Sequence, residues 1–204
     1  MDINPQIKTK RADVWKLTMT AMLSAIAFVL MFLEFSVPIM PPFIKMDLSD
    51  LPELIGAFAM GPASGVAVCL IKNLLHLMMS TTGGVGELSN FLLGVCFVLP
   101  AGLVYQRRKG KKSAIMGALL GALLMAAVSI VSNYYIVYPF YYNFMAEDAI
   151  LAAYQAIFPG VNNILQCLIV FNAPFTLVKG LFSVVITVLI YKHISPFLKG
   201  TNRS

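Results

Sequence analysis

The chain has 204 residues and a net charge of +6; 59% of its residues are hydrophobic and only 12% are charged, whereas soluble domains carry about 25% charged residues. A soluble fold of this length could not bury so many apolar side chains. The composition therefore excludes an ordinary soluble domain and predicts an integral membrane protein within a lipid bilayer.

The positive charge is gathered in three short clusters. Twelve of the 15 Lys and Arg residues lie in residues 1–16, 107–112 and 192–204, beside apolar segments. The sequence has no basic face interleaved with aromatic residues, so we expect no nucleic-acid partner. Basic clusters that flank apolar spans are instead typical of the cytoplasmic ends of transmembrane helices.

Apolar segments predict an all-α bundle of six transmembrane helices. A spanning helix needs about 20 mostly apolar residues. In chain order, the expected helices are residues 14–37, 51–60, 63–80, 88–105, 114–138 and 173–191. The second helix is short, and it ends at the Gly61-Pro62 break.

Six crossings bring both termini to one side, which the basic clusters identify as the cytoplasm. The chain, residues 1–204, is then a single membrane domain. Its expected cytoplasmic parts are the N-terminal segment 1–13, the basic loop 107–113 and the tail 192–204.

Besides the turn at residues 81–86, two longer segments are expected outside the cell, at residues 38–50 and 139–172. Three prolines stiffen the first, and it alternates apolar residues with polar ones, so it can fold over a cavity and cover a ligand. As a simpler alternative, Ser49 and Asp50 cap the following helix. The second segment has room for a short lid helix within residues 146–158.

Small residues recur four positions apart on two predicted helices, as Ala21-x-x-x-Ala25 and Gly117-x-x-x-Gly121. Such spacing favours close approach of helices in membranes. For the two glycines, we expect packing within the chain.

Polar side chains at membrane depth are costly and need a partner, a cavity or a ligand. Asn172, Thr176 and Lys179 stand at i, i+4 and i+7 and therefore share one helix face. Asn133 lies near the outer end of the preceding predicted helix. We interpret these four residues as groups that bind a polar aromatic solute.

Three further ionisable residues, Lys72, His76 and Glu87, have no assigned role. Lys72 and His76 share a helix face that could contribute to a site. In the alternative, Lys72 pairs with Glu87 or with a loop carboxylate.

The sequence shows no catalytic or cofactor-binding motif. Residues 81–87 read TTGGVGE, but they lack the Lys-Ser/Thr of a phosphate-binding loop and follow no predicted strand. Cys69, Cys96 and Cys167 lack the paired spacing of a metal site or disulfide framework. The two histidines have no serine protease motif beside them, so we expect neither an enzyme nor a bound metal or cofactor.

Together these segments resemble the riboflavin-specific substrate-binding subunits, the RibU group of S-components, of energy-coupling factor (ECF) vitamin transporters. The resemblance covers nearly the whole chain. The residues that carry it are FIKMDLSDLP at 43–52, GAFAMGP at 56–62, the Lys72-Asn73 pair and TGGVGE at 82–87.

The resemblance implies a subunit of the bacterial plasma membrane that captures riboflavin outside and releases it inside. Ala21 and Ala25 would dock the transmembrane coupling subunit, the T-component, and two ATPase subunits would supply energy. The implied riboflavin-binding residues are Lys45, Met46, Asp47, Leu48, Asn133, Asn172, Thr176 and Lys179. Lys179 would donate to the flavin ring, and the loop would meet the ribityl hydroxyls.

Two transport alternatives remain open on the sequence. One is an S-component for another vitamin, such as thiamine or biotin. The other is a self-sufficient secondary carrier, although the chain lacks the internal repeat that many such carriers have.

Overall fold

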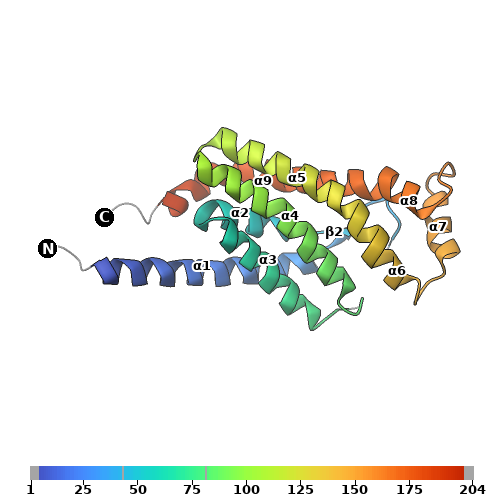
Figure 1. Ribbon diagram of the computed structural model, residues 1–204, viewed down its shortest axis with the longest axis horizontal. Coiled ribbons are helices and arrows are strands. Elements are labelled where there is room, and N and C mark those ends of the chain that lie inside the picture. Colours follow the sequence, from blue (N-terminus) through green and yellow to red (C-terminus); the bar gives the residue numbers. More distant parts are fainter. Residues whose placement is uncertain (1–4, 43, 81, 200–204) are drawn as a thin grey trace.

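The computed structural model describes residues 5–42, 44–80 and 82–199; the remaining parts of the predicted N-terminal segment, loop 38–50 and C-terminal tail lie outside the described residues. It is an elongated bundle of helices (Figure 1). The helices are α1 (Pro5–Phe32), α2 (Asp50–Met60), α3 (Pro62–Leu77), α4 (Val85–Arg107), α5 (Lys111–Ser132), α6 (Tyr138–Tyr141), α7 (Glu147–Gln155), α8 (Ile164–Cys167) and α9 (Ala173–Lys199).

Two π-helical turns complete the long helices. The turn η1 (Asn133–Val137) joins α5 to α6, and η2 (Leu168–Asn172) joins α8 to α9. A π-turn widens the helix by one residue, which changes the direction of the side chains around it, and such turns are frequent at functional sites. Both turns contain an asparagine of the predicted site.

Among the described residues, four helical stretches are long and apolar enough to cross a membrane. They are Asp13–Phe32, Val85–Arg107, Lys111–Tyr141 and Ile164–Ile190. Helices α2 and α3, with 11 and 16 residues, are shorter than a full span. The prediction of a helical membrane protein is confirmed, whereas six full-length spans are not found in the part of the chain that the structure describes.

Several predicted helix boundaries differ from the structure: α1 begins at Pro5 rather than residue 14, and α9 continues to Lys199 rather than residue 191. The predicted loop 139–172 ends early because helix resumes at Ile164, where the Asn163 side chain accepts a hydrogen bond from the Gln166 backbone N–H at 2.9 Å. The first helix ends at Phe32 rather than residue 37.

The expectation of a purely α-helical chain misses one small sheet. Strands β1 (Phe35–Ser36) and β2 (Lys45–Met46) pair antiparallel, so that Phe35 lies opposite Met46. The pairing satisfies backbone groups on both sides of the proline-containing segment. It also brings the two ends of the segment between Ser36 and Lys45 together, as in a hairpin.

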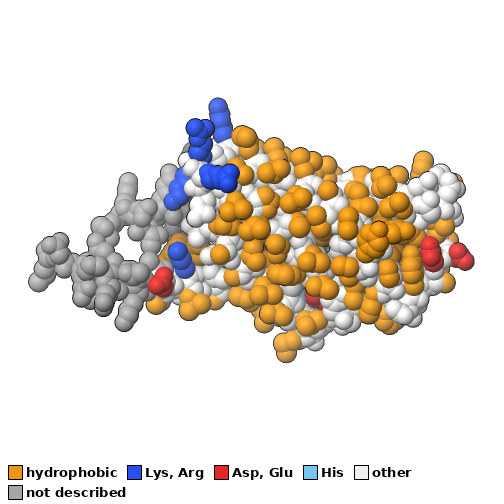
Figure 2. Space-filling model, in the orientation of Figure 1, with side chains coloured by type: hydrophobic (Ala, Val, Ile, Leu, Met, Phe, Trp, Pro, Cys, Tyr) orange, Lys and Arg blue, Asp and Glu red, His pale blue; other side chains and the backbone are white. Residues whose placement is uncertain are grey.

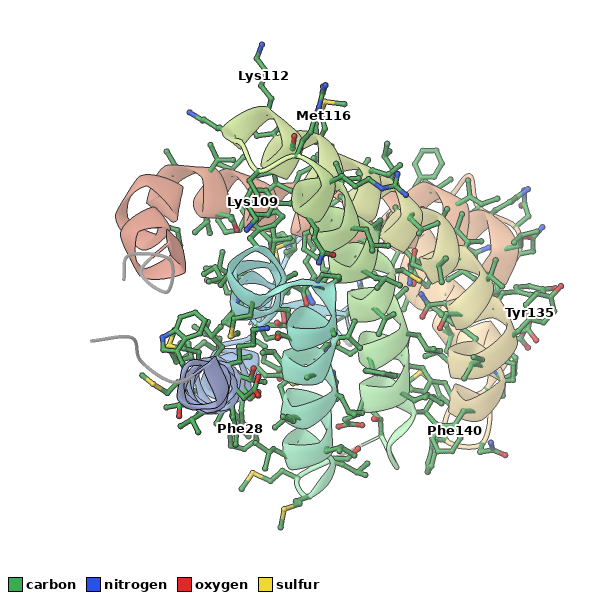
Figure 3. All side chains as sticks on the ribbon, turned by 60° about the vertical axis from the view of Figure 1, so that its left-hand side comes forward. Phe28, Lys109, Lys112, Met116, Tyr135 and Phe140 are labelled. Carbon is green, nitrogen blue, oxygen red and sulfur yellow. The ribbon has the colours of Figure 1, made fainter. Side chains whose placement is uncertain are left out.

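The bundle surface is apolar over most of its length, as Figure 2 shows. Only 22% of the α1 span and 28% of the Ile164–Ile190 span are buried within the protein. Figure 3 shows Tyr135 and Phe140 pointing outward, and Tyr135 is 72% exposed. Lipid is the environment in which such a surface is stable.

Charged side chains mark the two ends of the bundle. Lys and Arg side chains gather at the end that holds the α4–α5 turn, and acidic side chains appear at the opposite end beside α7 (Figures 1 and 2). The first described residues of α1 and the last of α9 also lie at the basic end (Figure 1). The bundle therefore has a basic pole and an acidic pole.

Close packing of α4 on α5 depends on small residues. A Cβ atom on Gly117 would lie 2.8 Å from the Ala101 carbonyl oxygen, and one on Gly121 would overlap the Phe97 carbonyl. The predicted packing role of Gly117 and Gly121 is therefore confirmed.

Candidate functional site

The loop of residues 38–50 is bound to α9 through Lys179. The Lys179 ammonium Nζ lies 3.1 Å from Asp47 Oδ2 and 3.2 Å from Asp50 Oδ2. The Lys179 side chain is 11% exposed, and Asp50 is fully buried. Lys179 and Asp47 both belong to the predicted site, and the structure brings them into direct contact.

Lys72 of α3 extends this network into the protein interior. Its Nζ donates to Ser49 Oγ at 2.5 Å, lies 3.3 Å from Asp50 Oδ1 and contacts the Glu53 carboxylate. Lys72, Asp50 and Glu53 are all fully buried. A buried charge network of this kind requires mutual neutralisation.

The pKa of Asp47 is held well below its usual range. Burial of the carboxyl group on its own raises the pKa, but the positive charges of Lys179 and Lys72 outweigh burial and lower it. The Ser49 backbone N–H also donates to Asp47 Oδ1 at 2.7 Å. Asp47 is therefore a carboxylate at neutral pH.

The other predicted loop residues have different environments. Lys45 is exposed and pairs with Glu34. Met46 is 7% exposed, and Leu48 is partly buried. Of the four predicted loop residues, Asp47 is the one that the structure joins directly to Lys179.

Asn172 belongs to a second polar group, at the start of α9. Its Oδ1 accepts a hydrogen bond of 2.7 Å from the Tyr154 hydroxyl of α7, and that hydroxyl in turn contacts the Tyr138 hydroxyl. Tyr154 is fully buried, and its pKa is raised by burial and by Tyr138. Thr176, one turn beyond Asn172, is 7% exposed.

Asn133 lies at the first position of η1, where its side-chain Nδ2 donates to the Ser129 carbonyl at 2.8 Å. Tyr134, Tyr135 and Tyr138 follow Asn133, and aromatic residues near a helix end are typical either of an interfacial belt or of a pocket. Tyr134 and Tyr135 are 41% and 72% exposed, whereas Tyr138 is 2% exposed. The belt interpretation therefore suits the first two, and Tyr138 belongs to the interior.

Sequence reasoning missed several members of these two groups. Pairing of Lys72 with a loop carboxylate was one open alternative. It is confirmed for Asp50, the last residue of loop 38–50, whose Oδ1 lies 3.3 Å from Lys72 Nζ. The other alternative, pairing of Lys72 with Glu87, is wrong because Glu87 Oε1 contacts His76 Nδ1 at 2.8 Å. Nothing in the sequence pattern indicated Tyr154, because α7 had no assigned position in space.

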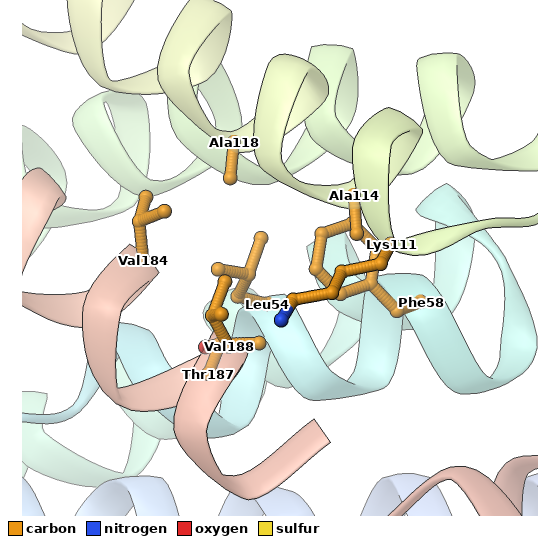
Figure 4. A pocket seen from close by; sticks show the side chains of 8 residues that line it. All are labelled: Leu54, Phe58, Lys111, Ala114, Ala118, Val184, Thr187 and Val188. Carbon is orange, nitrogen blue, oxygen red and sulfur yellow. The ribbon is translucent and has the colours of Figure 1, made fainter. Parts of the chain in front are cut away.

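A small cavity lies elsewhere, between α2, α5 and α9 (Figure 4). Its lining is mostly apolar, with Leu54 and Val184, and includes Lys111 and Thr187. Its volume of about 10 Å³ is at the lower limit for one water molecule. This cavity is far too small for a vitamin.

The polar groups of this site are suited to recognition of a solute. Within residues 5–42, 44–80 and 82–199, no three His, Cys, Asp or Glu side chains are grouped as metal ligands would be. Ammonium and amide groups on α9, under a loop attached to the same helix, are suited to hydrogen-bonding a neutral polar solute.

Ala21 and Ala25 are both exposed on α1. The neighbouring Leu23 and Ala27 are buried in a cluster with Val68 of α3. One side of α1 is therefore packed on the bundle, and the side with the two alanines is exposed.

Membrane-spanning helices with a buried polar site beneath a loop are typical of a solute-binding membrane protein. Residues 15–191 match the family model of the ECF transporter, substrate-specific component. The chain belongs to this family.

Individual relatives agree with the family assignment. The chain is 35% identical to the riboflavin transporter RibU of Staphylococcus aureus (strain TCH60), over 90% of this chain and 92% of the relative. It is 32% identical to the riboflavin transporter FmnP of Bacillus subtilis (strain 168), over 91% and 95%. Both relatives are named as transporters and not as enzymes.

A solved structure of the S component of a bacterial ECF transporter has the same fold. It superposes with a TM-score of 0.71 at 33% sequence identity, covering 92% of this chain and 99% of that one. The S-component fold is therefore established for this chain.

Proposed function

We propose that this chain is the riboflavin-binding subunit of an ATP-driven ECF importer in the plasma membrane of a bacterium. The observation that carries the proposal is the contact of Lys179 with Asp47. It supports a site in which the lysine that we expect to bind the ring is joined to the loop that we expect to cover the ligand. Two relatives named riboflavin transporters, each matched over about nine-tenths of this chain, support the same ligand.

Lys179 has the capacity to hold the loop and the ligand together. A lysine ammonium has three N–H donors. Asp47 Oδ2 accepts one of them, while Asp50 Oδ2 lies at an ion-pair distance of 3.2 Å without a hydrogen bond. The remaining donors are available to a carbonyl or ring nitrogen of the flavin. Loop position and ligand contact would then depend on the same cation.

The remaining contacts follow the expected site. The long helices supply short side chains with amide or hydroxyl groups, from Asn133, Asn172 and Thr176. The loop supplies apolar surface from Met46 and Leu48. Riboflavin is neutral and flat, so a site of this mixed character is suited to it. Lys45 and Asp47 would meet the ribityl hydroxyls.

In this proposal the chain crosses the membrane six times, with α2 and α3 as short crossings and with both termini in the cytoplasm. The basic pole at the α4–α5 turn supports that orientation (Figure 2). Ala21 and Ala25 dock the transmembrane coupling subunit, and two ATPase subunits drive release of the vitamin into the cytoplasm.

The test is equilibrium binding to the detergent-purified protein with a panel of riboflavin, thiamine and biotin. We expect stoichiometric binding of riboflavin alone, with a yellow flavin spectrum in protein purified from riboflavin-grown cells. Preferred binding of another vitamin would assign the subunit to that vitamin, and a colourless protein without uptake would refute the proposal.

Reconstitution into vesicles distinguishes the subunit from a self-sufficient carrier. The isolated chain should bind riboflavin without accumulating it, and addition of the coupling and ATPase subunits with ATP should start uptake. Sustained gradient-driven accumulation by the chain alone would favour the carrier.

A further inference from the structure

Tyr138, Tyr154 and Asn172 form a buried hydrogen-bonded chain from three separate elements. Tyr138 begins α6, Tyr154 lies on α7 and Asn172 ends η2. Their exposed fractions are 2%, 0% and 7%. Burying a hydroxyl without a hydrogen-bond partner costs free energy, so the hydrogen bonds among these three groups stabilise the folded protein.

The chain of hydrogen bonds has a direction. The Tyr154 hydroxyl has one proton, and it donates that proton to Asn172 Oδ1 at 2.7 Å. In its contact with Tyr138, Tyr154 is therefore the acceptor and Tyr138 is the donor. The carbonyl oxygen of the Asn172 amide is engaged, and its Nδ2 carries the N–H donors.

This fixes which half of the amide can face a ligand. An unrestrained asparagine can rotate to present either its oxygen or its nitrogen. With a rotated amide, N–H groups would face the Tyr154 hydroxyl, which would then donate to Tyr138, and the hydrogen bonds of the described residues give the buried Tyr138 proton no other acceptor. The Tyr154 contact therefore selects one amide orientation.

The surroundings hold Tyr154 rigidly enough for that role. Tyr154 packs with Tyr138, Ile150, Val161 and Phe171 in one buried apolar cluster, and its ring centre lies 5.2 Å from that of Phe171. The same cluster includes Met40 of loop 38–50. Helix α7 is thus packed into the bundle next to the predicted site.

We propose that Tyr154 is a positioning residue, which holds the Asn172 amide so that it offers hydrogen-bond donors, and not an acceptor, to the bound vitamin. The inference rests on the proposed function, in which Asn172 contacts riboflavin. Together with the Lys179 ammonium, this makes the α9 face selective for ligands with hydrogen-bond acceptors along one edge, such as the carbonyl oxygens of a flavin ring.

The experiment measures Kd for riboflavin, 2-thioriboflavin and 4-thioriboflavin, whose thiocarbonyl sulfur is a weaker acceptor than oxygen. In one of the two analogues, sulfur replaces the ring oxygen that accepts a hydrogen bond from Asn172. The wild-type protein should bind that analogue about three- to tenfold more weakly than riboflavin, which is the range expected for one hydrogen bond. In Tyr154→Phe, riboflavin binding should weaken by a similar factor while binding of that analogue stays nearly unchanged. The preference for oxygen over sulfur is therefore lost.

Tyr138→Phe is the second variant, because it removes only the donor to Tyr154 and should reduce the same preference by a smaller factor. Tyr142→Phe, at an exposed position, is the matched control and should bind like the wild type. Equal weakening for all three ligands in Tyr154→Phe, unchanged affinity, or a wild-type protein without preference for oxygen would each overturn the inference. Failure of the wild type to bind riboflavin would instead refute the proposed function.

Discussion

The Lys179 ammonium lies 3.1 Å from the Asp47 carboxylate, although the two residues are 132 positions apart in the chain. This contact joins the loop of residues 38–50 to the last long helix. Because Asp50 also lies 3.2 Å from Lys179 and 3.3 Å from Lys72, the loop end is held between α3 and α9. Charge pairing thus determines where the loop rests on the bundle.

Replacing Lys179 with methionine should weaken riboflavin binding at least tenfold, because the substitution removes both the donor to the ring and the attachment of the loop. It should also lower thermal stability of the ligand-free protein, since Asp47 is left buried with fewer partners. Titration of flavin fluorescence and thermal unfolding measure the two effects.

Glu34→Gln is the matched control for Lys179→Met. It breaks the exposed Lys45–Glu34 pair, and surface pairs contribute about 0–1 kcal/mol. We expect nearly unchanged stability and affinity for the control. Wild-type affinity in Lys179→Met would remove that lysine from the site.

Asp47 makes the stability of the ligand-free protein depend on pH in the acid range. Its folded-state pKa is depressed, so its contribution is fully present above the ordinary carboxyl pKa, about 3.9, and is lost as the pH falls from there through the folded value. Thermal unfolding of wild type and Asp47→Asn between pH 7 and pH 3 measures this. The stability difference should be constant above about pH 5 and shrink below about pH 4; a difference that grows on acidification would contradict the assignment.

The fold could be predicted from sequence wherever apolar length was decisive. The long spans around α4 and α5 follow from hydropathy alone. The helical turns α8 and η2 that precede α9 could not be found this way, because Asn172 interrupts the apolar run and η2 accommodates it inside a continuous helical stretch. The β1–β2 pairing was hidden because two-residue strands have no periodicity.

For the site, one helix face was predictable and its partners were not. Helical spacing places Asn172, Thr176 and Lys179 together without any knowledge of the fold. The Lys179–Asp47 contact is a tertiary contact between residues far apart in the sequence, so no local sequence pattern indicates it. Likewise Tyr154 is one of eight tyrosines in sequence, and only the packing of α7 distinguishes it.

Lys72 and Glu53 should behave as a coupled pair. Each is fully buried, and they are in direct contact. Lys72→Met alone leaves buried carboxylates without their main cation and should destabilise the protein by about 3–5 kcal/mol. The double variant Lys72→Met/Glu53→Gln should recover part of that loss, because it removes an unpaired charge.

The coupling energy of the pair is obtained from denaturant or thermal unfolding of Lys72→Met, of Glu53→Gln and of the double variant. An additive loss in the double variant would show that Lys72 stabilises the fold independently of Glu53. Binding of riboflavin to each folded variant then reports whether the interior part of the network also supports the loop.

Ala21→Leu should abolish uptake while leaving riboflavin binding intact. Ala21 and Ala25 are exposed on a helix whose opposite side is packed on α3, so a larger side chain there meets no neighbour within the chain. In contact with a partner helix, however, the added bulk prevents the close approach that small residues permit.

Ala127→Leu on α5, also at an exposed alanine, adds the same bulk elsewhere on the lipid-facing surface and should preserve both activities. Copurification with the coupling subunit, vesicle uptake and Kd are measured for each variant; normal uptake by Ala21→Leu, or equal loss in the Ala127→Leu control, would place the docking surface elsewhere.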